Sequence, residues 1–299
     1  MSNSKYLVVI NPVPNRARKK ILDKLLGYLN KKNINWQIYP TEQLLSANKH
    51  YFESYISQYS DVLVVGGDGT FHNVINALGC FTDVKLGLVP AGTGNDFARW
   101  LYGKNRHNYP FIFEQVTRSQ TVDISLGKCV FSDNSVRFFH NVLGLGFDAM
   151  LAKELRHNKG LFPSLGYLSK AIKKLPFYKE SELDLSLGNE QKQYFNLITA
   201  FANSAYFGSG MKIAPDAEPI HDTLEMCRIE KLPVHQTFSQ ILRLFNGSHI
   251  DHKGVDYRTI SHEAQIKTVG LDVEADGEYL GQSPCQVSIV KKALKIKRP

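Results

Sequence analysis

The stretch that decides the fold reads Asp61-Val62-Leu63-Val64-Val65-Gly66-Gly67-Asp68-Gly69-Thr70. Its apolar run, Val62 to Val65, is typical of a parallel strand covered on both faces. The glycines that follow allow the backbone positive φ and a close approach to a ligand. A helical pattern through Val74, Ile75 and Leu78 comes next. In such a strand–loop–helix unit, the loop N–H groups and the helix N-terminus face an anion such as phosphate.

A tight turn with an aspartate cap is the ordinary interpretation of a single Gly-Gly pair. Chance would place all five residues from Gly66 to Thr70 in roughly one chain per four thousand of this length, which favours a phosphate loop. Asp68 by itself repels phosphate, and a bridging Mg²⁺ would reverse that effect. Thr70 can either cap the helix or bond a phosphate oxygen.

A second glycine loop, Ala91-Gly92-Thr93-Gly94-Asn95-Asp96, follows the strand-like run Leu86 to Val89 and enters another helical pattern. Taken alone, Asn95 and Asp96 are ordinary helix-capping residues. In an open parallel sheet, however, ligands bind beyond the carboxyl ends of the strands. Two glycine loops at successive strand ends are therefore expected to face one crevice.

The segments around these loops divide the chain in two. Residues 1–126 alternate strand-like and helix-like segments, which predicts a doubly wound α/β domain. Residues 127–289 are mostly strand-like and predict a β-rich second domain. The expected helices of this second part are Ala149–His157, Leu168–Leu175 and Gln236–Phe245.

Composition excludes several classes of protein. The 299 residues include 43% hydrophobic and 21% charged residues and carry a formal charge of +8, so disorder and a collagen-like repeat are excluded. The chain has no CxxC pair, and its four scattered cysteines indicate a reducing compartment and a cytoplasmic protein: Cys80, Cys129, Cys227 and Cys285. The longest apolar stretch is far below the ~20 residues that span a bilayer, so any membrane contact is expected to be peripheral.

The order and spacing of several motifs resemble the diacylglycerol kinase catalytic-domain family, in its branch of soluble bacterial lipid kinases. The matching segments are Asn11-Pro12, Gly66–Thr70, Gly92–Asp96, Val122-Asp123-Ile124, Gly144–Ala149, Ala214–Ala217 and Asp276-Gly277-Glu278. The resemblance implies an N-terminal domain like those of phosphofructokinases and NAD kinases, and a C-terminal domain resembling a β-sandwich that binds lipid. It also implies that the last strand, near residues 290–299, returns to the first domain.

The resemblance assigns roles to individual residues. It implies an ATP- and Mg²⁺-dependent kinase that phosphorylates the hydroxyl of diacylglycerol or a related lipid, giving phosphatidic acid or its analogue. The carboxylates matching an acidic network around the catalytic Mg²⁺ are Asp68, Asp96 and Asp123. The residues expected to contact nucleotide are Asn11, Arg16, Thr41, Gly66, Gly67, Asp68, Gly69, Thr70, Thr93 and Asn95. Thr41 is also a plausible N-cap of the helix that follows it.

The acceptor hydroxyl must lose its proton to a carboxylate. Asp276 and Glu278 flank Gly277 and are the candidates for this base, although Ala275-Asp276-Gly277-Glu278 alone reads as a hairpin turn. The resemblance favours catalysis, and the sequence leaves open which of the two is the base.

Three features depart from the family pattern. The expected structural Mg²⁺ site has Asp222 as a ligand with the carbonyls of Pro219 and Leu224, but Thr223 stands where glycine is usual. The first loop lacks the usual Ser-Gly after Asn11-Pro12, with Arg16 as a substitute phosphate contact. Asn73 stands where a glutamate is common.

Two alternatives follow from these observations. An NAD kinase shares Gly-Gly-Asp-Gly-Thr but is not expected to carry Asp276-Gly277-Glu278. A nucleotide- or lipid-binding regulator without turnover is compatible with Asn73 and the altered first loop. The basic surplus indicates attraction to ATP and to an anionic membrane surface, through residues 16–24 and 291–298. No nucleic-acid-binding motif accompanies the charge, and strand edges in the second domain make a homodimer plausible.

Overall fold

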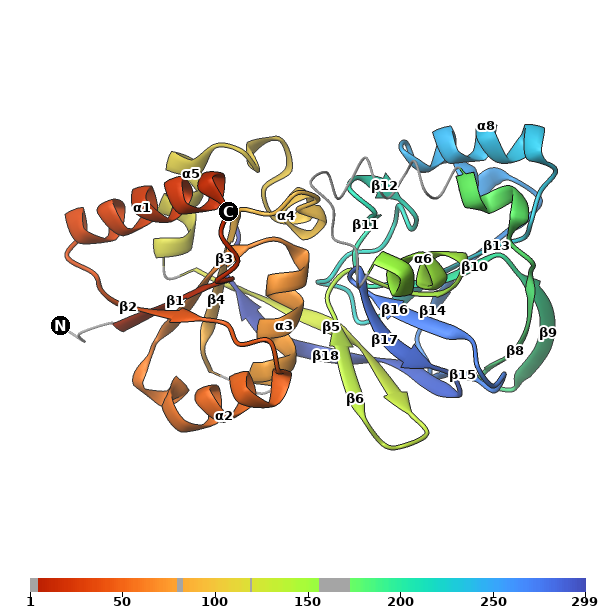
Figure 1. Ribbon diagram of the computed structural model, residues 1–299, viewed down its shortest axis with the longest axis horizontal. Coiled ribbons are helices and arrows are strands. Elements are labelled where there is room, and N and C mark those ends of the chain that lie inside the picture. Colours follow the sequence, from red (N-terminus) through yellow and green to blue (C-terminus); the bar gives the residue numbers. More distant parts are fainter. Residues whose placement is uncertain (1–4, 80–82, 119, 156–172) are drawn as a thin grey trace. The chain divides into compact units, whose positions relative to one another are not determined.

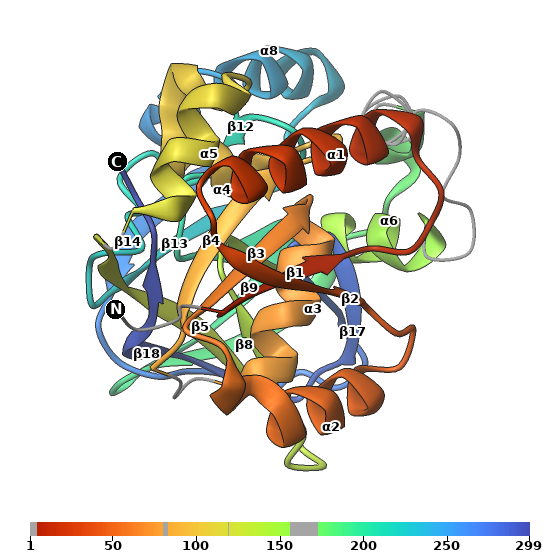
Figure 2. The ribbon, with the colours of Figure 1, turned by 90° about the vertical axis from the view of Figure 1, so that its left-hand side faces the viewer.

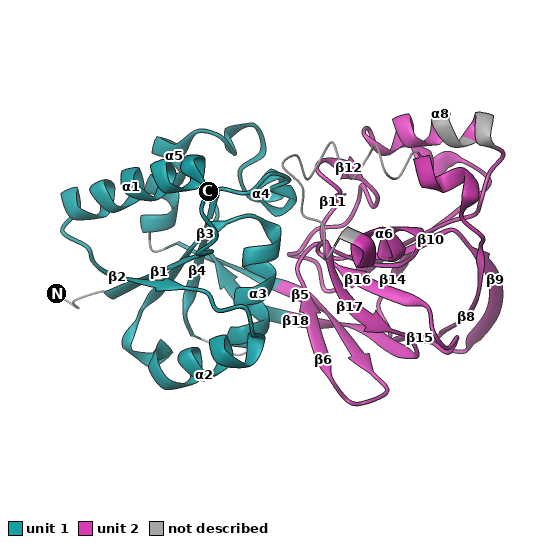
Figure 3. Cartoon of the chain, in the orientation of Figure 1, with its two compact units in different colours: residues 1–124, 292–299 teal, residues 125–291 magenta. Residues whose placement is uncertain are grey.

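A computed structural model of the protein describes residues 5–79, 83–118, 120–155 and 173–299. The chain forms two compact units, shown in Figure 3. Unit 1 comprises residues 1–124 and 292–299, and unit 2 comprises residues 125–291.

Unit 1 is built on a parallel sheet. Its strands are ordered β2 (Asn35–Pro40), β1 (Lys5–Ile10), β3 (Asp61–Gly66), β4 (Lys85–Pro90) and the C-terminal end of β18 (Cys285–Ile296). The last strand pairs in parallel with β4 through Lys295 and Ile296. The order reverses beside β1, which pairs with β2 on one side and β3 on the other. Such a switch point is where doubly wound sheets bind their ligands.

Helices cover both faces of this sheet, with α1 and α5 on one side and α2 and α3 on the other, as Figure 2 shows. Their bounds are α1 (Arg16–Lys31), α2 (Leu45–Tyr55), α3 (Asp68–Leu78), α4 (Asp96–Tyr102) and α5 (Tyr109–Thr117), with 3₁₀ turns at Ile56–Gln58 and Gly103–Asn105. Val62 to Val65 are fully buried, which explains their continuous apolar pattern. The predicted α/β fold of the first domain is therefore confirmed.

Unit 2 contains a six-stranded antiparallel sheet, whose strands other than β7 are labelled in Figure 1. Its order is β14 (Val255–Ile260), β13 (Leu224–Ile229), β10 (Ile198–Ala202), β7 (Val142–Gly146), β16 (Asp272–Ala275) and β17 (Glu278–Gln282). The N-terminal part of β18 pairs with β5 (Val122–Phe131) and β15 (Ala264–Ile266), and the pairing continues to β6 (Val136–Phe139), β8 (Ser181–Leu187) and β9 (Glu190–Asn196), so that these strands and those of unit 1 form one ten-stranded sheet. Side chains of both sheets, among them Leu145, Phe201, Leu185 and Ile266, share one buried core. The predicted sandwich-like domain is thus confirmed.

A second core covers the other face of the six-stranded sheet. It involves α6 (Phe147–Leu155) and α8 (Val234–Leu244), with 3₁₀ turns at Leu175–Phe177 and Ser248–Asp251 and the short strands β11 (Tyr206–Phe207) and β12 (Met211–Lys212). The predicted helices at Ala149–His157 and Gln236–Phe245 correspond to α6 and α8. Residues 156–172, which include the end of the first of these and most of the predicted Leu168–Leu175 helix, lie outside the described residues.

Among the described residues, no helix is long and apolar enough to cross a membrane. Cys129, Cys227 and Cys285 are buried free thiols, while Cys80 lies outside the described part of the chain.

Candidate active site

The two glycine loops of unit 1 pack directly against each other. The N–H of Ala91 donates to the carbonyl of Gly66 at 2.9 Å. A Cβ added to Gly67 would lie 2.8 Å from the Cα of Gly92, which is closer than side chains tolerate. Because both strands end at the same edge of the sheet, the loops meet there, and glycine is required at both positions for this contact.

Asp68 joins the two loops through its carboxylate. Its Oδ2 accepts the N–H of Asp96 and its Oδ1 accepts the N–H of Phe97, both at 3.0 Å. These donors belong to the first turn of α4, whose partial positive charge stabilises a carboxylate. Asp68 therefore holds the second loop in place, a structural role that its position in the first motif did not reveal.

Asn95 fixes the shape of the second loop. Its backbone adopts the left-handed region at φ 50°, and its side chain bonds both the N–H and the carbonyl of Gly92 at 3.0 and 2.9 Å. Asparagine adopts this conformation more readily than most residues, since its short polar side chain bonds nearby backbone. Thr93, in contrast, is exposed at the tip of this loop.

The helix caps differ from the sequence prediction at two positions. Helix α3 begins at Asp68 with Gly67 as N-cap, so Thr70 lies inside the helix, buried against Gly66. Helix α2 begins after Leu44 without a side-chain cap, so the prediction that Thr41 caps it is wrong. Thr41 is instead buried, and its N–H donates to the carbonyl of Ile10 at the end of β1.

Asn48 fixes the loop before α2 and also contacts Asn73. Its Oδ1 accepts the N–H of Glu42, and its Nδ2 donates to the Oδ1 of Asn73 at 3.0 Å. Asn48 is fully buried. The amide of Asn73 therefore accepts a hydrogen bond from the residue that fixes the loop before α2. Asn73, which stands where the family commonly has glutamate, thus has a structural role.

Arg18, not Arg16, organises the first loop. Its Nη1 donates to the carbonyls of Asn11 and Val13, both at 3.1 Å, and its burial lowers the pKa of the guanidinium. Its N–H donates to the side chain of Asn15, the N-cap of α1. Arg16 is exposed at the start of the helix. The spacing in the sequence could have predicted this role of Arg18. A residue three positions after a capping asparagine lies in the first turn of the helix, where a long side chain can reach back over the preceding loop.

All three carboxylates of the predicted Mg²⁺ network lie in unit 1. Asp96 is buried, and its Oδ1 lies 3.2 Å from Nε of Arg99, while Asp123 is exposed on β5. Asp68 and Asp96 are brought together by the hydrogen bond between them. Carboxylate oxygens are the donors that Mg²⁺ prefers, and the ion keeps several waters, so the chemistry of this donor set fits a water-mediated site.

The second predicted motif forms a hairpin turn in unit 2. Asp276 and Gly277 have φ of 54° and 83° between β16 and β17, as an Asp-Gly turn requires. The side chain of Asp276 is completely buried. It accepts the N–H groups of His140, Asn141 and Val142 at 2.9–3.2 Å and lies 2.8 Å from Nδ1 of His140. Glu278 is half-buried at the start of β17.

A buried pair of carboxyl groups lies beside this turn. Gly144 on β7 pairs with Glu274 on β16. The Oδ2 of Asp148 fills the space that a Cβ at Gly144 would need, and the Oε1 of Glu274 lies 3.0 Å from that position. The Oε2 of Glu274 accepts the N–H of Gly277. Burial raises the pKa of Asp148 to about 7, and burial together with the Asp148 carboxyl raises the pKa of Glu274 well above its usual value.

This pair predicts a specific pH dependence of stability. Between about pH 4 and pH 7, Asp148 is ionised in the unfolded chain and protonated in the folded one, so the free energy of unfolding falls as pH rises, by up to about 1.4 kcal/mol per pH unit. Asp148→Asn removes the contribution of this carboxyl and is expected to lower the slope, while the contribution of Glu274, whose pKa is also raised, remains; urea unfolding across this range measures the slope. Asp133→Asn, at an exposed turn between β5 and β6, is the control and should keep the wild-type slope. An Asp148→Asn protein with that same slope would contradict the pairing.

Two predicted ligands of the structural Mg²⁺ site, Pro219 and Asp222, are hydrogen-bonded to Ser125. The N–H of Ser125 donates to the carbonyl of Pro219 at 2.7 Å, and its hydroxyl donates to Oδ1 of Asp222 at 3.0 Å. Leu224 is buried at the start of β13. Two of the three predicted ligands therefore lie close together, held by a serine that the sequence analysis did not single out.

Part of the basic C-terminal segment is not available to a membrane. Lys297 is buried, with its Nζ 2.5 Å from Oδ1 of Asp61, and Arg298 stacks 4.0 Å above the ring of Trp100. In contrast, the basic residues of α1 are exposed: Arg16, Lys19, Lys20 and Lys24.

Comparison with protein families agrees with this arrangement. Residues 5–129 match the diacylglycerol kinase catalytic domain, and residues 141–298 match the YegS C-terminal NAD kinase beta sandwich-like domain. The chain belongs to the family of the YegS C-terminal NAD kinase beta sandwich-like domain, whose model matches more than half of it, and its first part is similar to the diacylglycerol kinase catalytic domain. The glycine loops and Asp68 lie in the first matched region, and Asp276 and Glu278 lie in the second.

Individual relatives in this family are distant. A diacylglycerol kinase of Mycobacterium tuberculosis (strain H37Rv) is 28% identical over 84% of this chain and 81% of its own. A crystal structure of a diacylglycerol kinase from Bacillus anthracis matches with a TM-score of 0.70 at 16% identity, covering 99% of this chain and 97% of that one. An NAD kinase from Archaeoglobus fulgidus in complex with ATP matches with a TM-score of 0.56 at 11% identity, covering 98% and 93%. Family membership supports a kinase-type enzyme, and the structural likeness shows a shared fold.

Proposed function

We propose that the protein is an ATP- and Mg²⁺-dependent lipid kinase that phosphorylates the hydroxyl of diacylglycerol or a related lipid, giving phosphatidic acid or its analogue. The observation that carries the proposal is the interlocking of the two glycine loops at the carboxyl ends of the neighbouring strands β3 and β4. A pair of loops without side chains at their contact brings backbone N–H groups close to a phosphate chain. The family's relatives that are named diacylglycerol kinases support the lipid acceptor.

The charges in unit 1 suit phosphoryl transfer. Catalysis of this reaction consists mainly of positioning and of neutralising charge on the transferring group, and a bound Mg²⁺ would supply part of that neutralisation. Asp68, Asp96 and Asp123 would hold that ion through water. Asp68 is fixed by two backbone N–H groups, so its carboxylate keeps a constant orientation.

Transfer to a lipid is tested by incubating the protein with labelled ATP, Mg²⁺ and mixed micelles that contain a panel of lipid alcohols. Label in the lipid extract is the expected result, and it should require Mg²⁺. Label on NAD added in place of lipid would indicate an NAD kinase. Saturable ATP binding with no transfer to any acceptor would indicate a regulator and contradict the proposal.

The contact between the glycine loops can be tested with a single methyl group. In Gly92→Ala, the new Cβ would overlap Cα of Gly67 and lie 2.9 Å from Oδ1 of Asn95, so the loops must separate. We expect ATP affinity, measured by calorimetric titration, to fall at least about tenfold, because misplacement of about 1 Å costs orders of magnitude at such sites.

The control for this variant is Gly27→Ala, in the middle of α1, where a Cβ meets nothing within 4 Å. It should keep wild-type ATP affinity and gain about 0.5–1 kcal/mol of stability. Equal ATP affinities for the two variants would show that the loop contact does not shape the nucleotide site.

Attraction to an anionic membrane is the proposed role of the exposed basic face of α1. Each lysine near such a surface contributes on the order of 1 kcal/mol, and salt screens this attraction. Raising the ionic strength should therefore weaken sedimentation with anionic vesicles more than it slows turnover of a dispersed short-chain lipid. A triple Lys19→Gln, Lys20→Gln, Lys24→Gln variant should lose most of the salt-sensitive binding. Vesicle binding and short-chain turnover that fall in parallel with salt would contradict this role.

A further inference from the structure

The hairpin turn between β16 and β17 is held at two points within unit 2. On one side, the carboxylate of Asp276 accepts three backbone N–H groups of residues 140–142, and its own N–H donates to the carbonyl of Val142 at 3.0 Å. On the other side, the N–H of Gly277 donates to Oε2 of Glu274 at 2.9 Å. Gly277 lies outside the paired positions of the two strands, so a side chain supplies its acceptor.

The second of these contacts lies next to a candidate base. Glu278 follows Gly277 directly and begins β17, so the direction of its side chain depends on where the turn peptide is held. A carboxylate that takes a proton from a hydroxyl must lie within hydrogen-bonding distance of it, about 2.6–3.2 Å. Loss of the Gly277 contact would therefore move Glu278 without changing its chemistry.

Glu274 is itself fixed by its neighbours. It lies on β16 opposite Gly144 on β7, and Asp148 from the first turn of α6 fills the space above this glycine. The Oδ2 of Asp148 occupies the place that a Cβ at Gly144 would take, and Oε1 of Glu274 lies 3.0 Å from that place. Two carboxyl oxygens therefore border one point above the sheet, and the absence of a side chain at Gly144 makes room for both.

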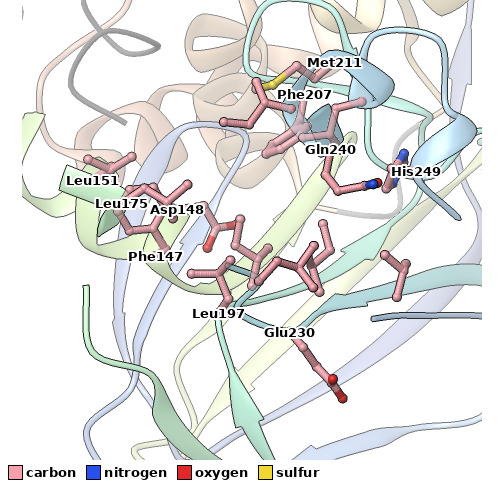
Figure 4. A pocket seen from close by; sticks show the side chains of 16 residues that line it. Phe147, Asp148, Leu151, Leu175, Leu197, Phe207, Met211, Glu230, Gln240 and His249 are labelled. Carbon is pink, nitrogen blue, oxygen red and sulfur yellow. The ribbon is translucent and has the colours of Figure 1, made fainter. Parts of the chain in front are cut away.

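The surroundings of these two carboxyl groups are mostly apolar. In Figure 4, Asp148 is one of the few polar side chains among the residues that line an apolar pocket, with Phe147 and Leu151 from the same helix. Asp148 and Glu274 are both buried. The Oδ1 of Asp148 accepts the N–H of Ala149 at 2.9 Å, whereas its Oδ2 is buried without a hydrogen-bond partner in the described part of the chain. Burial away from water disfavours two negative charges so close together.

A proton shared by the pair removes this conflict. Burial raises the pKa of Asp148 to about 7, and burial together with the Asp148 carboxyl raises the pKa of Glu274 well above its usual value. With one proton between Oδ2 of Asp148 and Oε1 of Glu274, the two side chains attract each other, and Oε2 of Glu274 stays available to accept the N–H of Gly277. The pair then links the first turn of α6 to the hairpin turn.

We propose that Glu274 is a positioning residue for phosphoryl transfer: it holds Gly277 and thereby the carboxylate of Glu278, and Asp148 holds Glu274 in place. The proposal rests on the proposed kinase function, because Glu278 acts as a base only in that reaction. Glu274 is a poor candidate for the base itself, since it is buried and its Oε2 already accepts a backbone N–H. Its expected effect is on kcat through geometry, with no effect on the affinity for ATP.

Two substitutions of similar length test this role. Glu274→Gln keeps an oxygen that accepts the N–H of Gly277, and its NH₂ group can donate to Asp148 in place of the shared proton. Glu274→Met fills a similar space but removes the acceptor oxygen. We expect Glu274→Met to lower kcat for lipid phosphorylation about 10–100-fold with an unchanged KM for ATP, because a misplacement of about 1 Å costs up to about 100-fold. Glu274→Gln should keep kcat close to the wild-type value, and equal losses in the two variants would overturn the positioning role.

Glu225→Met is the matched control. Glu225 is a buried glutamate on β13 of the same six-stranded sheet, and its carboxylate accepts the hydroxyl of Thr259 at 2.9 Å. Strands β10 and β7 separate β13 from β16. The control should lower the melting temperature, because the hydroxyl of Thr259 loses its acceptor, while kcat stays at the wild-type value. A kcat in Glu225→Met as low as in Glu274→Met would show a general effect of sheet stability and would overturn the proposal.

Hydrogen exchange of the peptide that contains Gly277, followed by mass spectrometry, measures the turn without turnover. The Gly277 amide should exchange faster in Glu274→Met than in the wild type. Glu274→Gln and Glu225→Met should keep the wild-type exchange rate. If the wild type phosphorylates no lipid but Glu274→Met exchanges faster, the kinase proposal fails and the contact with the turn stands. If the wild type phosphorylates lipid while Glu274→Met keeps both its exchange rate and its kcat, the positioning role fails and the kinase proposal stands.

Discussion

Glu278→Gln is expected to lower turnover by about 10²–10⁴-fold while ATP binding and stability stay near wild type, because positioned general bases contribute about that much to rate. Glu278 is the better candidate for the base because the carboxylate of Asp276 is already hydrogen-bonded. Both carboxylate oxygens of the buried Asp276 are held by backbone N–H groups of residues 140–142 and by the ring of His140. A base must accept a new proton, and Glu278 is the more accessible carboxylate.

Asp276→Asn is the matched comparison and should behave differently. An amide places an N–H₂ donor among donors, so the turn loses hydrogen bonds, at a cost of about 1–3 kcal/mol of unfolding free energy. Its turnover should fall through displacement of the turn. Steady-state kinetics, ATP titration and urea unfolding of both variants separate these effects. Near-full turnover in Glu278→Gln would show that Glu278 is not the base. A stability loss confined to Glu278→Gln would show that Glu278, and not Asp276, holds the turn in place.

The features that could be predicted from the sequence are those with a local cause. A buried strand that ends in Gly66-Gly67 fixes a loop at the edge of a parallel sheet, and a second strand that ends before Ala91 places the next loop beside it. The meeting of the two loops follows from this topology. The hairpin at Asp276-Gly277 is also local, because this residue pair favours positive φ at both positions.

Features that depend on distant pairing were not predicted. Asp148 and Glu274 lie far apart in the sequence, and their contact requires the register of β7 against β16 together with the absence of a side chain at Gly144. The Gly-Phe-Asp-Ala motif gives no sign that its aspartate is buried beside another acid. An apolar cavity in unit 2 has the same origin, since its lining residues Leu151, Met211 and Ile241 come from three separate segments.

Helix starts were predicted less well because several capping residues compete near each one. Thr41 has the right chemistry for an N-cap, but its N–H pairs with Ile10 at the end of β1, and the helix begins only at Leu45. Asn48, which lies inside the helix, accepts the N–H of Glu42 and donates to its carbonyl, so it holds the loop before the helix. The nearby strand decided this boundary, and its influence is not visible in local propensity.

Lys297 gives the clearest case of a residue whose role depends on topology. In sequence it belongs to the basic C-terminal run that is expected to contribute attraction to an anionic membrane surface. In the structure, its N–H donates to Leu86 on β4, which extends the pairing of β18 and brings the side chain into unit 1. There its Nζ contacts Asp61 at 2.5 Å and donates to the carbonyl of Arg118 at 2.7 Å. Burial lowers the pKa of Lys297, and the Asp61 carboxylate opposes that shift.

Lys297→Ala is therefore expected to lower the free energy of unfolding by about 3–5 kcal/mol, because it leaves the carboxylate of Asp61 buried without its cation. Urea unfolding measures the loss. Lys295→Ala is the control: its partner Asp83 is fully exposed, and such surface pairs contribute only about 0–1 kcal/mol. The double variant Lys297→Met, Asp61→Leu should recover most of the stability, since apolar replacement of a whole buried pair is often neutral. A double variant as unstable as Lys297→Ala, or equal losses at positions 295 and 297, would show that the buried charge of Asp61 is not the cause.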